Sequence, residues 1–255
     1  MTQAKLDPRT RRRSSAARRV RDLLRAAIVH EELPAGVLPG EAELMLAFSS
    51  SRQVIRDALA LLRDEGLVMR VPGTGTFSVA SKVRHSFGHL HGPAPERDRV
   101  LHRILNMGRE TAPPRVADQL GIEPGADCGL IEYVTVLGDE PYSASTAYVP
   151  VPLLEVMARA QSAAEWYSVY EAGGFELGVT DQVVEAIVAD EMVAELLEVS
   201  PGAPLMLFER LIRDRAGCPL EYAFARVRGD RLTLMAQLPR RVLPPRRPLP
   251  LEGTV

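Results

Sequence analysis

The first third of the chain contains three stretches in which hydrophobic residues recur at helical spacing, followed by two short β-prone runs. The helical stretches span about residues 15–30, 40–48 and 52–65. The β-prone runs, 67–71 and 76–79, flank a Pro-Gly-Thr-Gly turn, which predicts a hairpin. Three helices followed by a hairpin are typical of a winged helix-turn-helix, which we place at residues 15–80.

Two residues define the ends of the third helical stretch. Ser51 directly precedes it, and a serine at this position can accept a hydrogen bond from a backbone N–H of the first turn. Gly66 follows it, and glycine readily adopts the left-handed conformation in which many helices end. The sequence therefore predicts a helix with a defined start and a defined stop.

The second half of the chain contains an internal repeat with an offset of 77 residues, because the segment from Leu120 to Gly125 resembles the segment from Leu197 to Gly202. Each copy has the order helix end, Pro-Gly turn, strand, polar turn, strand. We expect strands at 130–137, 142–149, 179–186, 205–213, 220–227 and 232–238, and helices at 153–160, 166–172 and 190–198. Hairpins mixed with helices indicate an α+β fold with a mostly antiparallel sheet, which we place at residues 98–239.

Three segments lack a regular hydrophobic pattern. Residues 81–97 contain Gly, Pro and His without a clear period and are expected to form a linker. Residues 1–14 are expected to be a basic disordered arm. Residues 240–255 are rich in proline, which indicates an extended or disordered tail.

The composition excludes several classes of protein. No apolar run approaches the roughly 20 residues of a membrane span, and no apolar stretch follows the basic N-terminus, so we expect a cytoplasmic protein. Cys128 and Cys218 are far apart and form no CxxC motif. His85, His89 and His91 do not share one helix face, so we expect no metal site and no cofactor.

Charge is distributed unevenly along the chain. Residues 1–82 contain 14 basic and 9 acidic residues, whereas residues 83–255 contain 17 basic and 24 acidic residues. The first 21 residues hold eight basic residues against Asp7 alone. A basic first part and an acidic second part indicate that the first part meets a polyanion, and the N-terminal arm could follow DNA phosphates or enter a minor groove.

Segment 23–79 resembles the GntR family of bacterial regulators. The matching residues are Leu38-Pro39-Gly40-Glu41, Glu43-Leu44, Phe48, Ser51-Arg52, Val54, Arg56, Ala58-Leu59, Leu62, Glu65-Gly66-Leu67-Val68 and Gly73-Thr74-Gly75-Thr76-Phe77. Two departures are evident. Ala42 replaces an arginine that contacts DNA in the family, and Ser49-Ser50 replaces a Gly-Val pair, which removes a residue suited to a left-handed turn.

The resemblance implies that the third helix enters the major groove of double-stranded DNA and that the hairpin, or wing, reaches the neighbouring backbone. Arg52 and Arg56 lie four residues apart on one helix face and can each pair with guanine, and Gln53 can read adenine or bind a phosphate. The full set of expected DNA-contacting residues is Ser51, Arg52, Gln53, Arg56, Arg70, Gly73, Thr74 and Gly75. Such modules bind inverted repeats as dimers, so a homodimer is expected.

Segment 113–238 resembles the UTRA effector domain of the HutC subfamily, whose fold is similar to that of chorismate lyase. The matching residues are Leu120-Gly121, Pro124-Gly125, Glu140-Pro141, Tyr148-Val149-Pro150, Pro201-Gly202-Ala203-Pro204, Glu209-Arg210, Pro219-Leu220-Glu221-Tyr222 and Arg228-Gly229-Asp230-Arg231. The resemblance implies a small-molecule effector and a dimerising platform.

The expected effector site departs from the family at four positions. Many relatives hold a phosphorylated sugar or an acidic ligand with arginines, but Tyr133 and Thr135 stand at those positions here. Ser145 replaces a glutamate and Leu232 replaces a tyrosine. These replacements disfavour a sugar phosphate, because a buried phosphate requires cationic or N–H partners. The sequence indicates a neutral or apolar effector, or a site that has lost its function.

Arg210 and Glu221 are the charged residues retained near this expected pocket. They could contact the effector, or they could pair with each other across the hairpin. The sequence thus favours a DNA-binding regulator, a repressor released from its operator by a small molecule. An orphan or partner-regulated repressor is an alternative, and a chorismate-lyase-like enzyme is another, although no nucleophile–base pair or catalytic acid pair is evident.

Overall fold

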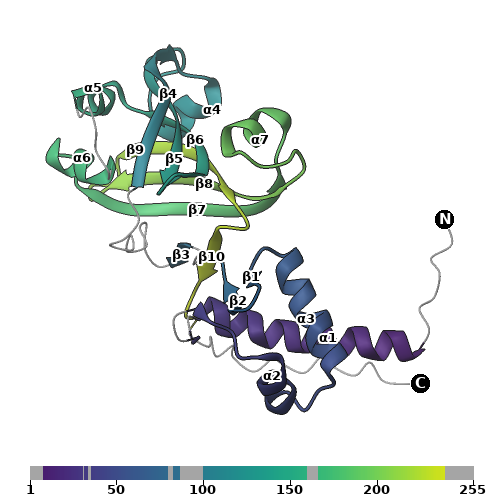
Figure 1. The fold of residues 1–255 in the computed structure, drawn as a ribbon. Coiled ribbons are helices and arrows are strands. Elements are labelled where there is room, and N and C mark those ends of the chain that lie inside the picture. Colours follow the sequence, from purple (N-terminus) through teal and green to yellow (C-terminus); the bar gives the residue numbers. More distant parts are fainter. Residues whose placement is uncertain are drawn as a thin grey trace, which may run out of the picture.

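The computed structural model describes residues 8–30, 32–33, 36–79, 83–86, 100–159 and 166–238. The elements form a helical group at the N-terminal end and a sheet-based group at the C-terminal end (Figure 1). Residues 1–7 of the expected arm and the whole expected tail, 240–255, lie outside the described residues. No helix in the described ranges is long and apolar enough to cross a membrane.

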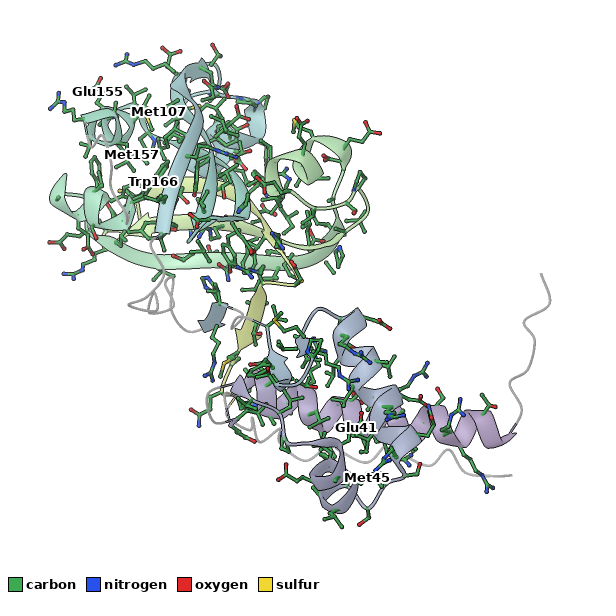
Figure 2. All side chains as sticks on the ribbon, in the orientation of Figure 1. Glu41, Met45, Met107, Glu155, Met157 and Trp166 are labelled. Carbon is green, nitrogen blue, oxygen red and sulfur yellow. The ribbon has the colours of Figure 1, made fainter. Side chains whose placement is uncertain are left out.

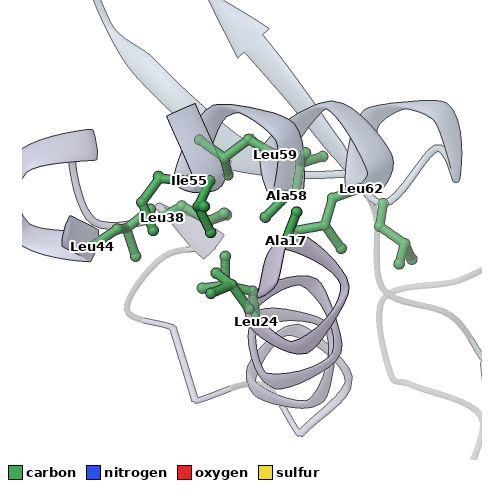
Figure 3. Close-up of a cluster of buried hydrophobic side chains, with 12 residues drawn as sticks. Ala17, Leu24, Leu38, Leu44, Ile55, Ala58, Leu59 and Leu62 are labelled. Carbon is green, nitrogen blue, oxygen red and sulfur yellow. The ribbon is translucent and has the colours of Figure 1, made fainter. Parts of the chain in front are cut away.

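The helical group is a winged helix-turn-helix, as predicted. Its elements are α1 (Pro8–Val29), α2 (Glu41–Ala47), α3 (Arg52–Asp64), β1 (Val68–Val71) and β2 (Gly75–Ser78), and the two strands form an antiparallel hairpin. One apolar cluster holds the three helices together (Figure 3). It contains Leu24 of α1, Leu44 of α2, and Ile55 and Leu62 of α3, all of which are buried.

The first helix begins at Pro8, so residues 8–14 are helical and the expected disordered arm is wrong for this segment. Proline is suited to the first turn of a helix, because its fixed φ is helical and its missing N–H would have no partner there. The Arg-rich run that follows has good helix propensity. Arg13 also contacts Asp57 of α3, with 3.1 Å between Nε and Oδ2.

The turn between α2 and α3 adopts the left-handed conformation that the Ser49-Ser50 replacement was expected to disfavour. Ser49 has φ +45°, a value that glycine tolerates and serine rarely adopts. The neighbouring helix ends follow the sequence predictions: the Ser51 hydroxyl accepts from the Val54 N–H at 3.4 Å, and Gly66 has φ +67° directly after α3. The turn therefore survives at the cost of one strained residue.

The second group is built on one six-stranded sheet with the order β4-β5-β6-β9-β8-β7, in which every neighbouring pair is antiparallel. The strands are β4 (Val100–Thr111), β5 (Asp127–Leu137), β6 (Glu140–Val149), β7 (Leu177–Val188), β8 (Pro204–Asp214) and β9 (Pro219–Arg228). This confirms the predicted α+β class. The sequence pattern did not reveal β4, although the repeat places it 77 residues before β7.

The internal repeat corresponds to two equivalent units that meet in the centre of the sheet. One unit consists of β4, α4 (Pro114–Leu120), β5 and β6, and the other of β7, α7 (Glu191–Leu197), β8 and β9. The offset of 77 residues holds from the start of β4 and β7 to the end of β5 and β8. Even the helix ends correspond, because Gly121 and Glu198 both adopt left-handed conformations, with φ +64° and +54°.

The two faces of the sheet carry different helices. The helices of the repeat, α4 and α7, cover one face, where Cys128 and Leu211 pack beside α4 and Leu205 packs beside α7. The other face carries α5 (Val151–Arg159) and α6 (Trp166–Ala172), which lie in the connection between the units (Figure 1). Tyr133 and Ala223 belong to the apolar cluster on this second face.

The expected linker contains a short strand, which corrects the prediction that residues 81–97 lack regular structure. Strand β3 (Val83–Ser86) pairs in parallel with β10 (Leu232–Met235), the strand that follows the sheet. The Val83 N–H also donates to the Arg231 carbonyl at 2.8 Å. The two strands of this pair are far apart in the sequence. A local hydrophobic pattern does not predict which distant strands pair.

We expect Ser49→Gly to stabilise the helix-turn-helix by about 0.5–1 kcal/mol, because relief of the left-handed strain exceeds the additional backbone entropy that glycine loses on folding. Hydrogen exchange of the α2 and α3 amides in the full chain measures this as a slower rate. Ser50→Gly is the matched control. It should accelerate exchange, because its hydroxyl donates to the Phe48 carbonyl at 2.9 Å and glycine removes that bond. Equal rates in both variants would contradict the assignment of strain to Ser49.

Candidate DNA-binding and effector sites

The exposed face of α3 carries the side chains that the sequence singled out. Arg52, Gln53 and Arg56 are exposed, while Val54 and Ile55 point into the helical core. This division follows from the helical period, because residues four apart lie on one side of the helix and the intervening apolar residues lie on the other. The face thus presents two guanidinium groups and one amide near the start of α3, next to the N-cap Ser51.

Charged contacts tie this face to the two preceding helices. The Arg56 Nε lies 3.0 Å from Glu41 Oε2 on α2, and Glu41 is labelled in Figure 2. The Gln53 amide donates to Asp57 at 2.7 Å, and Asp57 also contacts Arg13. Exposed pairs of this kind contribute about 0–1 kcal/mol each to stability. Their main effect is to restrict the rotamers of side chains that point into solvent.

The tip of the wing has a backbone conformation that would allow the main chain to approach a ligand closely. Arg70 is exposed on β1, and Thr74 is exposed at the turn. Gly73 and Gly75 have φ +77° and +138°, conformations that residues with a Cβ rarely adopt. A Cβ at Gly73 would meet no heavy atom within 4 Å, so the tip is open on that side.

The structure brings together five of the six residues expected at the effector site. Tyr133 and Thr135 lie on β5, Ser145 on β6, Arg210 on β8 and Glu221 on β9, and their positions in the strands place them on the face that carries α6. Tyr133 is directly opposite Ser145 in the β5–β6 register. The first unit of the repeat therefore contributes neutral side chains, and the second contributes the charges.

Arg210 and Glu221 form a buried pair, which was one of the two possibilities left open by the sequence. The Arg210 Nη2 lies 3.7 Å from Glu221 Oε1, and the two side chains are 15% and 3% exposed. Tyr170 of α6 donates to the other carboxylate oxygen at 2.6 Å. Burial, together with the Glu221 charge, raises the pKa of Tyr170 well above its ordinary value, so this tyrosine stays protonated as the donor.

The described residues do not satisfy all the hydrogen-bonding atoms of the Arg210–Glu221 pair. The Arg210 Nε and the Glu221 Oε1 are both buried without a hydrogen-bond partner within that part of the chain. A buried donor or acceptor left unpaired costs about 1–3 kcal/mol. One unpaired donor and one unpaired acceptor in the same pair can be satisfied by a ligand that offers both functions.

Aromatic rings line the neighbouring part of this face. Tyr133 lies 4.4 Å from Trp166 of α6 and 5.3 Å from His102 of β4, measured between ring centroids. His102 also lies 3.3 Å from the Thr135 hydroxyl, measured at Nδ1. Burial lowers the pKa of His102 to about 4, so its ring is neutral at pH 7 and adds no cation to the site.

The sequence pattern did not reveal His102, Trp166 and Tyr170 as members of this candidate site. The repeat could have revealed His102, because it implies a strand beside β5. Trp166 and Tyr170 lie on α6, which has no counterpart in the repeat, and their role depends on how that helix packs against the sheet.

Leu232 does not join the contacts of Arg210 and Glu221. It lies on β10 and packs in a neighbouring apolar cluster with Phe208, Ala225 and Val227. The reason is that β10 leaves the sheet and pairs with β3. Leu232 also lines an open cleft of about 500 Å³ between β10 and α1.

Comparisons with known proteins identify both parts of the chain. Residues 16–77 match the family described as bacterial regulatory proteins, gntR family, and residues 96–233 match the UTRA domain. The HTH-type transcriptional repressor NagR of Bacillus subtilis is 25% identical over 87% of this chain and 93% of its own length. The histidine utilization repressor of Pseudomonas aeruginosa is 28% identical over 68% of this chain and 71% of its own.

A solved structure supports the same fold. PhnF from Mycobacterium smegmatis superposes with a TM-score of 0.61 at 22% identity, covering 87% of this chain and all of that one. The two domain matches occur in one chain and in the order that the sequence resemblance predicted. The protein belongs to the GntR family of bacterial transcriptional regulators and carries a DNA-binding winged helix-turn-helix followed by a UTRA effector domain.

Proposed function

We propose that the protein is a homodimeric repressor that binds an inverted-repeat operator through α3 and the wing, and that a neutral small molecule bound in the UTRA domain releases it. The observation that carries the DNA-binding part is the exposed group of Arg52, Gln53 and Arg56 at the start of α3. Arginine and glutamine at these positions can form bidentate hydrogen bonds with guanine and adenine in the major groove.

Phosphate contacts would fix the position of α3 on the duplex. Ser51 stands at the start of the helix, where the helix dipole and free N–H groups favour an anion. Arg70 and Thr74 are exposed on the wing, and the glycines at its tip, Gly73 and Gly75, permit close approach of the backbone to DNA. Contacts of this kind set the register on DNA, while contacts to base edges select the sequence.

A homodimer is supported by the form of the recognition module and by the edges of the sheet. Helix-turn-helix modules read two half-sites related by two-fold symmetry. The edge strands β4 and β7 expose apolar side chains, including Ile104 and Val183. Exposed apolar residues on long edge strands favour contact with another chain.

A neutral effector is supported by the charges of the Arg210–Glu221 cluster. Its one described guanidinium already lies beside a buried carboxylate, and His102 is uncharged at pH 7. A phosphate placed here would face Glu221 without a free cation. An uncharged ligand that accepts from Arg210 and donates to Glu221, with a flat part against Tyr133 and Trp166, would meet no such repulsion.

The route from effector to DNA would pass through β3. His85 on β3 lies 6.4 Å from Phe208, measured between ring centroids, and its pKa is lowered by burial and by the charge of Arg210. The same strand follows the wing closely in sequence and pairs with β10. A ligand that binds one arrangement of this strand more tightly would shift the populations of the two states.

We expect Arg52→Ala and Arg56→Ala each to weaken operator binding roughly 5- to 150-fold per half-site, the value of one bidentate arginine–guanine contact. The measurement is selection of bound genomic fragments by the full-length protein, followed by titration of the recovered motif. Arg63→Ala is the matched control, because Arg63 is an exposed arginine near the other end of α3 and should leave the motif unchanged. Recovery of the same motif with the same affinity by all three variants would contradict recognition by the start of α3.

We expect glucose 6-phosphate to bind no more tightly than about 1 mM in calorimetry, because a buried phosphate requires cationic or N–H partners that this site does not offer freely. Thermal-shift measurements with benzamide and benzoate, which share a ring but differ in charge, test the same point. Benzamide should raise the melting temperature more than benzoate does. Micromolar binding of the sugar phosphate, or a larger shift with benzoate, would contradict a neutral effector.

A further inference from the structure

The first helix extends well past the core of its domain. Ala17 is the first buried residue among the described side chains of α1, while the helix begins at Pro8. Nine residues at about 1.5 Å of rise each give an extension of about 14 Å. Figure 1 shows this end of α1 projecting beyond α3 into solvent.

The extension has a strongly basic composition. Residues 8–19 contain no acidic residue and six arginines: Arg9, Arg11, Arg12, Arg13, Arg18 and Arg19. Arg12 and Arg18 are exposed, and neither has a described carboxylate within the 4.0 Å of an ion pair. Like charges at helical spacing repel one another and destabilise the helix. The stability of the domain therefore does not explain why so many arginines occur in this segment.

The extension starts beside the DNA-reading face. Arg13, 53% exposed, contacts Asp57 of α3, and Asp57 also accepts from Gln53 and follows Arg56 directly. The basic end of α1 is therefore continuous with the exposed face of α3. A duplex seated against Arg52, Gln53 and Arg56 would place a phosphate backbone along the flank that Arg13 occupies.

We propose that the N-terminal extension of α1, residues 8–19, binds the phosphates of the DNA that flanks the bases read by α3. The nine residues that precede Ala17 span about 14 Å, which corresponds to about four base pairs at 3.4 Å each, so each protomer covers a longer site than the winged helix-turn-helix alone requires. The contacts are to phosphate and carry no sequence information. They raise affinity for all duplexes and make it more dependent on salt.

The test uses the full chain with the double substitution Arg12→Ala and Arg13→Ala. Its control is Arg115→Ala with Arg159→Ala, which removes two exposed arginines from helices of the UTRA domain and leaves the same net charge. Fluorescence anisotropy with a random-sequence 40-base-pair duplex, in 50–300 mM salt, gives the slope of log K against log salt. Each lost phosphate contact should reduce that slope by about 0.9, hence by about 1.8 per protomer. At 100 mM salt this corresponds to a loss of affinity on the order of 60-fold per protomer. Equal slopes for the double variant and the control overturn the proposal.

Asp57→Asn separates a phosphate contact from a purely structural role of Arg13. Both Arg13→Ala and Asp57→Asn remove the ion pair, but only the first removes the cation. We expect Asp57→Asn to bind the random duplex at least as tightly as the unsubstituted protein, because a negative charge beside the phosphates is lost. Weakening equal to that of Arg13→Ala would mean that the pair merely supports the fold, and would overturn the proposal.

The outcome is independent of base recognition by α3. If α3 does not read an operator, the genomic selection yields no motif, yet the slope difference on the random duplex persists. If a motif is recovered, removing four flanking base pairs from each side should weaken the unsubstituted protein and leave the double variant unchanged. Equal weakening of both would overturn the placement of the extension on flanking DNA.

Discussion

The pairing of β6 with β9 is the interaction on which the UTRA domain depends. Each unit of the repeat supplies three strands, and a three-stranded sheet with one helix would leave a long edge exposed at β6 or β9. Joining the two edges creates a six-stranded sheet. Helices α5 and α6 pack on the face of this sheet opposite to α4 and α7. The same junction brings Ser145 and Tyr133 of one unit beside Arg210 and Glu221 of the other, so the candidate effector site exists only because the two units are fused.

Burial of charge limits what this site can hold. Arg210 and Glu221 have lost most of their contact with water, and the mutual attraction of a buried pair offsets that loss only when the remaining polar atoms are also satisfied. Tyr170 satisfies one carboxylate oxygen, whereas Arg210 Nε and Glu221 Oε1 stay unpaired among the described residues. An arrangement of this kind favours a ligand that completes the hydrogen bonds over one that introduces a further charge.

The short β3–β10 pair connects the two domains of the chain. Strand β3 follows the wing, and β10 follows the last strand of the sheet, so the parallel pair connects the DNA-binding domain with both ends of the UTRA domain. The His85 ring from this pair lies near the Phe208 ring of β8, and residues of β10 line the cleft between β10 and α1.

The sequence by itself determined the winged helix-turn-helix, the ends of α3 and the repeat, because helical period, Ser51, Gly66 and the 77-residue offset are local or self-similar signals. It also placed Arg52 and Arg56 on an exposed face and indicated the strain at Ser49. Only the tertiary structure decided that residues 8–14 extend α1, that β3 pairs with β10, and that Leu232 packs away from Arg210 and Glu221. The tertiary structure also brings His102, Trp166 and Tyr170 into the candidate effector site. These outcomes depend on contacts between segments that are far apart in the chain. A local pattern of residues does not predict the free energy of such contacts.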